Sequence, residues 1–170
     1  MIFFMSNIKE KEEKKQKDRF DSIKKLTNHT DEPTKEMLMQ VVKRQDKYLS
    51  YKQKHMITMI CLYSSLLFYL IYLYNGILKP NAYSFGDIFH VMINDSISSF
   101  VLLIIFGIYA TMDYLYKKRE KAEKEFHALR CEIIDKSTDL WKSEEKWQQR
   151  GVVFEMMRNT YDVNLYHENK

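Results

Sequence analysis

Two long stretches without charge constrain this chain more than any other feature. Residues 56–78 contain no Asp, Glu, Lys or Arg, and a second uncharged stretch lies between Asp95 and Asp113. A helix over the first stretch would be about 35 Å long, enough to cross a hydrocarbon core of about 30 Å. Because only a helix satisfies its own backbone groups inside lipid, we predict transmembrane helices over residues 56–78 and 96–116. The alternative, a buried helix of a soluble domain, usually has an apolar stretch of only about 10 to 14 residues.

The distribution of basic residues predicts the orientation of these helices. Of the 27 Lys and Arg residues, only Lys79 lies between the two stretches. Loops rich in Lys and Arg remain in the cytoplasm, so both termini are predicted to be cytoplasmic and residues 79–95 to form an external loop. Tyr residues gather near the ends of both stretches, as in interfacial aromatic belts. The sequence therefore predicts a multi-pass protein of the cell membrane, with the lipid bilayer as a partner.

Composition limits the remaining possibilities. The chain has 170 residues, and with about 40 of them in lipid there is no room for a large soluble domain. The net charge of +4 is spread over long flanks that also contain many acids, so no nucleic-acid partner is expected. The two cysteines, Cys61 and Cys131, are far apart, which indicates neither a disulfide framework nor a thiolate metal site.

The N-terminal flank divides into two predicted segments. Residues 1–30 are dominated by charged and amide side chains and are predicted to be a mobile tail, whose translation could begin at Met1 or Met5. Thr30 or Asp31 can cap a helix and Pro33 suits its first turn, so residues 31–55 are predicted to be an amphipathic helix that continues into the bilayer. Its apolar stripe comprises Met37, Leu38, Val41, Val42, Tyr48 and Leu49.

The C-terminal flank carries a coiled-coil-like pattern over residues 117–150. Because the external loop is short, this stretch is expected to lie beside residues 31–55, so that the two stripes bury each other. Residues 135–139 are rich in Ser, Thr and Asp, which favour helix ends. The sequence supports a helix break in this segment and a continuous helix equally. Gly151 is the predicted stop, before a C-terminal amphipathic segment over residues 151–170. The candidate interaction seam comprises Ala122, Phe126, Leu129, Ile133, Leu140 and Trp147.

Two further groups of residues in the second stretch invite a functional interpretation. Ser99, Gly107 and Thr111 put small side chains on one helical face, a candidate packing face either within the chain or between subunits. Asp95 and Asp113 could be an ion or proton site, since acids inside membranes often mark such pathways. They lie at the ends of the stretch, which favours a helix cap for Asp95 and a pair with Lys117 for Asp113.

The sequence contains no arrangement that specifies a reaction, and it predicts no catalytic, cofactor-binding or metal-binding residue. There is no glycine-rich phosphate loop, and the chain has four glycines in all. No two histidines have the helical spacing of metal ligands. We therefore expect a protein that is not an enzyme and uses no cofactor. The five histidines are His29, His55, His90, His127 and His167.

Two segments carry a resemblance to a known family. The sequence DEPTKEML at residues 31–38, followed by Lys43-Arg44, and the ending YDVNLYH at residues 161–167 resemble the YpbF-like family of small two-span membrane proteins of Bacillus-type bacteria. The resemblance covers residues 30–170. It implies a bacterial cytoplasmic membrane and adds no catalytic residue.

Together these patterns predict an all-α protein, a two-span helical hairpin with long cytoplasmic extensions. The function expected is that of a helical interaction or scaffold module that binds itself or another membrane or cytosolic protein. The alternative is a homo-oligomeric two-span pore, and a membrane enzyme using His90, Asp95 and Asp113 is a third hypothesis. The sequence leaves the partner, the oligomeric state and the physiological role open. Residues that could line a pore are Ser64, Ser65, Ser96, Ser98, Ser99 and Thr111.

Overall fold

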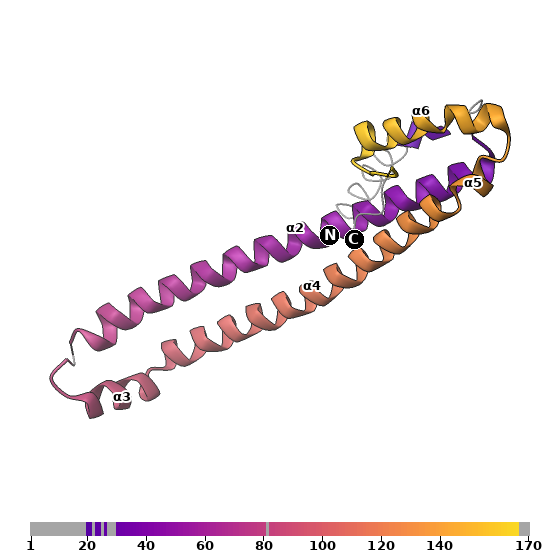
Figure 1. Cartoon of the computed structure of the whole chain (residues 1–170). Helices are drawn as coiled ribbons and strands as arrows, with labels where there is room; N and C mark the ends of the chain where they lie inside the picture. The colour runs from indigo at the N-terminus through magenta and orange to yellow at the C-terminus, as the bar shows by residue number, and fades with distance from the viewer. Residues whose placement is uncertain (1–19, 22, 25, 27–29, 81, 167–170) are drawn as a thin grey trace, which may run out of the picture. The chain divides into compact units, whose positions relative to one another are not determined.

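The computed structural model describes residues 20–21, 23–24, 26, 30–80 and 82–166. The regular secondary structure of these described residues is helical, which agrees with the predicted all-α fold. Of the predicted N-terminal tail, residues 1–19 lie outside the described residues. In chain order the elements are α2 (Glu32–Leu73), the π-helix η1 (Tyr74–Leu78), α3 (Phe85–Asn94), α4 (Ser96–Asp135), α5 (Ser137–Leu140) and α6 (Glu144–Tyr161), labelled as in Figure 1.

The chain divides into two compact units. One comprises Met1–Asp46 and Glu123–Lys170, here called the terminal unit, and the other comprises Lys47–Ala122, here called the hairpin unit. The helices α2 and α4 each contribute residues to both. Because the terminal unit is built from two segments distant in sequence, its core depends on contacts between them.

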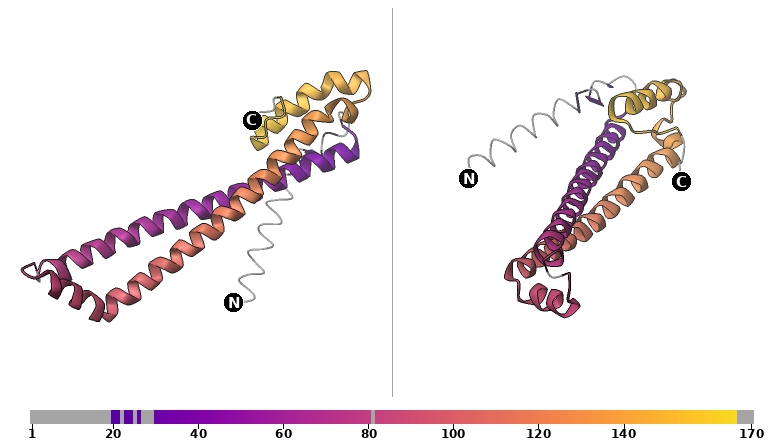
Figure 2. Two further views of the ribbon diagram at one scale, coloured as in Figure 1. Left: turned by 60° about the horizontal axis from the view of Figure 1, so that its bottom comes forward. Right: turned by 90° about the vertical axis from the view of Figure 1, so that its left-hand side faces the viewer.

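The core of the terminal unit contains part of each predicted apolar stripe. Tyr48 and Leu49 of the first stripe and Ala122 of the seam belong to the hairpin unit instead, and Leu49 is exposed. Leu38, Val41 and Val42 of α2 are fully buried, and Ile133 of α4 has no exposed surface. The helix α6 covers this pair through a third apolar face, and in Figure 2 it lies beside the last turns of α4. The residues that the C-terminal part of the chain adds to the core are Trp141, Val153, Phe154, Met157, Tyr161, Val163 and Leu165.

Ordered structure begins earlier than the sequence prediction placed it. Phe20, Ile23 and Leu26 belong to the predicted mobile tail, yet the three side chains are buried in the core of the terminal unit. They recur every three residues, a spacing that puts them on one side of a helical turn. The prediction was wrong for these residues because three apolar side chains among many charges were treated as isolated.

The helix break lies inside the segment where the sequence left it open. α4 ends at Asp135, Lys136 leaves helical geometry at ψ 9°, and the single turn α5 follows. Trp141 then turns into the core, where its ring meets that of Phe154 edge-on with centroids 5.5 Å apart. Ser143 caps α6 by accepting a hydrogen bond from the backbone N–H of Lys146. The break therefore lets the chain reverse and α6 return along the pair.

The predicted stop at Gly151 is wrong, because α6 continues through it to Tyr161. Gly151 is exposed, and an added Cβ there would meet no atom within 4 Å, so no close contact requires glycine at that position. The helix ends instead at Asp162, which takes a left-handed φ of 59°. Asn and Asp are the side chains that adopt this conformation most readily after glycine. The turn is held by Gln45, whose Nε2 donates to the Asp162 carbonyl at 3.1 Å.

The hairpin unit is formed by the apolar parts of α2 and α4. Both are long and apolar enough to cross a membrane by length and composition, and only 11% of the most apolar window of each is buried. Residues 79–95 were predicted to be a loop, but they contain the helix α3, capped by Ser84. α3 contacts η1 at the turn between the two long helices, as Figure 1 shows.

Candidate functional site

Hydrogen bonds join α2 and α4 at the end of the hairpin unit that carries α3. The Tyr69 hydroxyl and the buried Ser98 hydroxyl are 2.7 Å apart, and the Tyr72 hydroxyl donates to Asp95 Oδ2 at 2.6 Å. Asp95 also caps α4, because its two carboxylate oxygens accept from the backbone N–H groups of Ile97 and Ser98. One carboxylate therefore starts a helix and fixes that helix to its neighbour.

These contacts change the chemistry of Asp95. The pKa of its carboxyl is lowered, chiefly because the Tyr72 hydroxyl donates to it and further because backbone N–H groups of Ser98 and Ile97 do so. Each of these donors favours the charged form. The ordinary value is 3.8, so the carboxylate is ionised at neutral pH. Its environment is that of a structural cap.

We predict a pH-dependent effect of removing the Tyr72 hydroxyl. A lowered pKa means that the contact stabilises the fold above the ordinary pKa of 3.8 and that this stabilisation is lost as the pH falls through the lower folded value. Tyr72→Phe should therefore lower the melting temperature of the detergent-solubilised protein at pH 7, and the difference should shrink in strong acid. Carboxyl NMR should show the Asp95 pKa moving up toward 3.8. An equal loss at every pH would contradict the assignment.

Aromatic and basic side chains gather at the other end of the hairpin unit. The rings of His55 on α2 and Tyr116 on α4 are 5.7 Å apart between centroids, so these two residues lie at the same level. Around them, four cations each stand over a Tyr ring three or four residues earlier on the same helix. The pairs are Lys52 over Tyr48 at 5.8 Å, Lys54 over Tyr51 at 5.8 Å, Lys118 over Tyr114 at 5.4 Å and Arg119 over Tyr116 at 5.1 Å.

The spacing between these two levels matches a bilayer. From His55 to Tyr72 along α2 the rise is about 26 Å, and from Asp95 to Tyr116 along α4 it is about 32 Å. A hydrocarbon core is about 30 Å thick. The polar and ring contacts between α2 and α4 that are described above thus lie at the two ends of the hairpin unit, and the side chains between these ends are mostly apolar.

Asp113 and Lys117 form the predicted pair. Lys117 Nζ lies 2.7 Å from Asp113 Oδ2, and both side chains are exposed. The Asp113 carboxylate raises the pKa of Lys117, first through the hydrogen bond and then through its charge. The geometry is that of a helical ion pair at the level of the Tyr residues.

The candidate packing face is not covered by the rest of the chain. Ser99, Gly107 and Thr111 are exposed, and a Cβ added to Gly107 would meet no atom within 4 Å. Gly107 and Thr111 line an open groove of about 620 Å³ together with five further residues of α2 and α4. Ser99 is not among the residues that line this groove. Those five residues are Ile57, Thr58, Cys61, Ile104 and Ile108.

The candidate interaction seam is largely used inside the chain. Phe126, Leu129 and Ile133 are buried in the terminal unit, and Leu140 and Trp147 are half-buried against the same core. Ala122 is buried in the hairpin unit. A partner of the terminal unit would therefore meet other residues than this seam.

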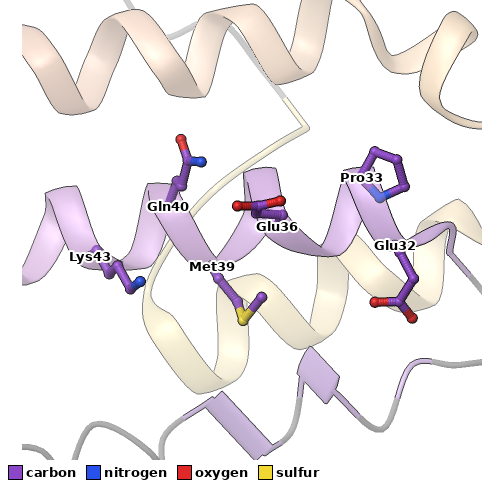
Figure 3. Close-up of a pocket in the computed structure, with 6 residues that line it drawn as sticks. All are labelled: Glu32, Pro33, Glu36, Met39, Gln40 and Lys43. Atoms are coloured by element: carbon purple, nitrogen blue, oxygen red, sulfur yellow. The ribbon is translucent and has the colours of Figure 1, made fainter.

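One groove of the terminal unit was missed by the sequence analysis. It follows the first turns of α2 on the side away from the buried stripe and has a volume of about 420 Å³ (Figure 3). Sequence reasoning followed the apolar period of this helix and gave no weight to its polar face. The lining residues are Glu32, Pro33, Glu36, Met39, Gln40 and Lys43.

The three histidines that the structure describes each contact a different neighbour. His90 contacts Asn94 one turn later, the His55 ring lies tilted against that of Tyr116, and His127 lies against Phe126. Both cysteines are free. Among the residues that the structure describes, no group of three or more His, Cys, Asp or Glu is arranged to hold a metal ion. His29 and His167 lie outside the described residues.

Comparison with known proteins places the chain among relatives without an assigned activity. Residues 37–168 match the family DUF2663, described as a protein of unknown function. The uncharacterized protein YpbF of Bacillus subtilis (strain 168) is 40% identical over 149 residues, which cover 85% of this chain and 95% of the relative. No solved structure matches the chain.

Proposed function

The chain belongs to the DUF2663 family, which includes YpbF-like proteins of unknown function, and from its structure we propose a two-span membrane protein that acts as a helical interaction or scaffold module. In this proposal it is not an enzyme. The hairpin unit lies in the cell membrane, both termini are cytoplasmic, and the terminal unit meets a partner protein or a second copy.

The observation that carries the proposal is the exposure of the apolar helices. Only 11% of each apolar window is buried, whereas the core helix of a soluble protein buries most of its apolar surface. Contiguous exposed apolar surface of this extent requires lipid or protein to cover it. The exposed side chains include Ile57, Ile60, Tyr63, Leu67, Phe68, Leu70, Ile71, Phe100, Leu103 and Phe106.

The terminal unit supports a role in protein contacts. Among its described residues, most large apolar side chains lie in its own core, and the exposed ones are Val152 and Tyr166. The groove on α2 combines the exposed carboxylate of Glu36 with Lys43, whose ammonium lies 5.6 Å from the ring centroid of Phe20. A surface of mixed charge around Met39 suits a reversible contact with another protein.

Several hydroxyl groups of the hairpin unit contact the protein itself, which favours this function over a pore. Thr58, Ser65 and Thr111 donate to carbonyls of their own helices, at 2.9, 2.8 and 2.9 Å, and the buried Ser98 hydroxyl lies 2.7 Å from that of Tyr69. The other residues that could line a pore, Ser64, Ser96 and Ser99, are exposed. Single-channel recording of the purified protein in planar bilayers tests the alternative, and a reproducible conductance would favour the pore.

Membrane topology gives the direct test of the proposal. Fusions of alkaline phosphatase, active outside, and of green fluorescent protein, active inside, should report cytoplasmic locations for both termini and an external location for residues 79–95. The native protein should remain in the membrane pellet after alkaline carbonate extraction. Release by carbonate, or termini on opposite sides, would refute the membrane assignment.

Site-specific crosslinking tests the interaction role. A photoreactive residue at Gln40, in the groove of α2, should capture a discrete product in intact cells, while one at the exposed Leu103 should reach mainly lipid. The product identifies either a second copy, by its doubled mass, or another protein. The same weak product pattern from both positions would count against the scaffold role.

A further inference from the structure

We propose that the end of the hairpin unit opposite α3 binds the phosphate groups of anionic phospholipids through Lys52, Lys54, Lys118 and Arg119, here called the basic collar. The inference rests on the proposed membrane location and adds the class of lipid. It concerns four side chains that form no ion pair with any residue that the structure describes.

The geometry of the basic collar is set by tyrosines. Each cation is held over a ring of its own helix, at 5.1 to 5.8 Å, and the contact between His55 and Tyr116 brings the two helices to a common level. Tyr rings prefer the boundary between hydrocarbon and headgroups. A cation paired with such a ring is therefore positioned at the depth of lipid phosphates.

The charge of the basic collar is uncompensated. Within the described part of the chain, no carboxylate lies within ion-pair distance of Lys52, Lys54, Lys118 or Arg119, although the adjacent Lys117 has Asp113. The Arg119 side chain is half-buried, and the fork formed by its guanidinium nitrogens suits a pair of phosphate oxygens.

The surroundings of the basic collar select a lipid instead of a free anion. Exposed apolar side chains lie next to the basic collar on both helices. On α2, Met56 and Ile57 follow Lys54 and are 48% and 61% exposed. On α4, Tyr114 precedes Lys118 and is 58% exposed. A ligand that satisfies both regions has an anionic head and an apolar tail. A zwitterionic headgroup would bring its own ammonium against the four cations, which disfavours it.

The opposite end of the hairpin unit has the reverse character. Residues 79–95, at this end, contain one Lys or Arg, Lys79, and two acidic residues, Asp87 and Asp95. This difference predicts that anionic lipids gather around the level of His55 and Tyr116 only. The preference for anionic lipids is therefore expected at the end of the hairpin unit near His55 and Tyr116, and not at the end near α3.

Lipid binding can be measured on the purified full-length protein. Native mass spectrometry of the detergent-solubilised chain, titrated with phosphatidylglycerol or phosphatidylcholine, should show a preference for phosphatidylglycerol. Combining Lys52→Gln, Lys54→Gln, Lys118→Gln and Arg119→Gln should reduce that preference by about tenfold. Inorganic phosphate in excess should compete weakly, because it lacks the tail; full competition by phosphate would mean a simple anion site and overturn the lipid assignment.

Two controls complete the experiment. Lys79→Gln, Lys142→Gln and Arg158→Gln remove charge from other exposed positions and should leave the lipid preference unchanged. Exchanging Lys for Arg and Arg for Lys throughout the basic collar should retain it. Equal binding of both lipids by the wild type, or an unchanged preference in the Gln variant with unchanged helicity, would overturn the inference. A chain that inserts into bilayers without lipid preference refutes this inference alone, whereas failure to insert refutes the proposed function.

Discussion

Replacing Leu67 and Leu103 by Arg should abolish stable membrane insertion. Both side chains are exposed, Leu67 at 59% and Leu103 at 69%, and both lie in the middle of an apolar stretch. Each Arg at the centre of a transmembrane helix costs about 2.5 to 3.5 kcal/mol of insertion free energy. We expect the double variant to leave the carbonate-resistant fraction or to be degraded.

The exposure of these two leucines makes this test decisive. In a soluble protein, an exposed Leu can be replaced by Arg with little effect, usually within about 0.5 kcal/mol of stability. The matched control is Leu67→Ala with Leu103→Ala, which keeps the stretch apolar and should preserve insertion. A double Arg variant that behaved as the wild type, or that became more soluble without loss of fold, would show that the apolar faces do not meet lipid.

Replacing Phe126 and Leu129 by Asp should unfold the terminal unit. Both side chains are buried, at 7% and 6% exposure, among α2, α4 and α6. A buried charge without a partner destabilises a fold by about 3 to 5 kcal/mol, and two of them approach the whole stability of a small unit. Circular dichroism should show lost helicity, and limited proteolysis should cleave the chain beyond residue 123.

The control for this prediction uses the other side of the same helix. Lys121 and Ala128 are exposed, so Lys121→Asp with Ala128→Asp introduces the same acids without burying them. This variant should keep its helicity and its protease resistance. The membrane fraction should be unchanged in both variants, since insertion depends on the hairpin unit. Retained protection in the Phe126 and Leu129 variant would contradict the core described above.

The sequence predicted the features that depend on periodicity and on charge. The stripe of Leu38, Val41 and Val42 and the seam of Phe126, Leu129 and Ile133 are buried as helical spacing requires. The cap at Asp95 and its position beside Ser96 followed from side-chain chemistry, and the structure places it at the start of α4. Such features are local and are readable from a single segment.

The features that escaped prediction depend on distant contacts. Phe20, Ile23 and Leu26 are buried in a core to which α2, α4 and α6 contribute, and the charged segment around these three residues gives no sign of that core. Gly151 did not end its helix because residues on both sides of it, Trp147 and Val153, pack against the same core. The hydrogen bond of Tyr72 to Asp95 joins residues from different helices, so the sequence around either residue did not predict this contact.

The composition of the terminal unit sets an order for biosynthesis. Its core combines Leu38 and Val41, which are made before the hairpin unit, with Met157 and Leu165, which are made after it. During translation the early helix has no partner, and its apolar stripe is available to chaperones or to neighbouring nascent chains. The hairpin unit has all of its sequence before residue 123 and can complete its helices first. A chain that stopped before α6 would therefore contain the complete hairpin unit but lack part of the core of the terminal unit, which would be left open to proteases.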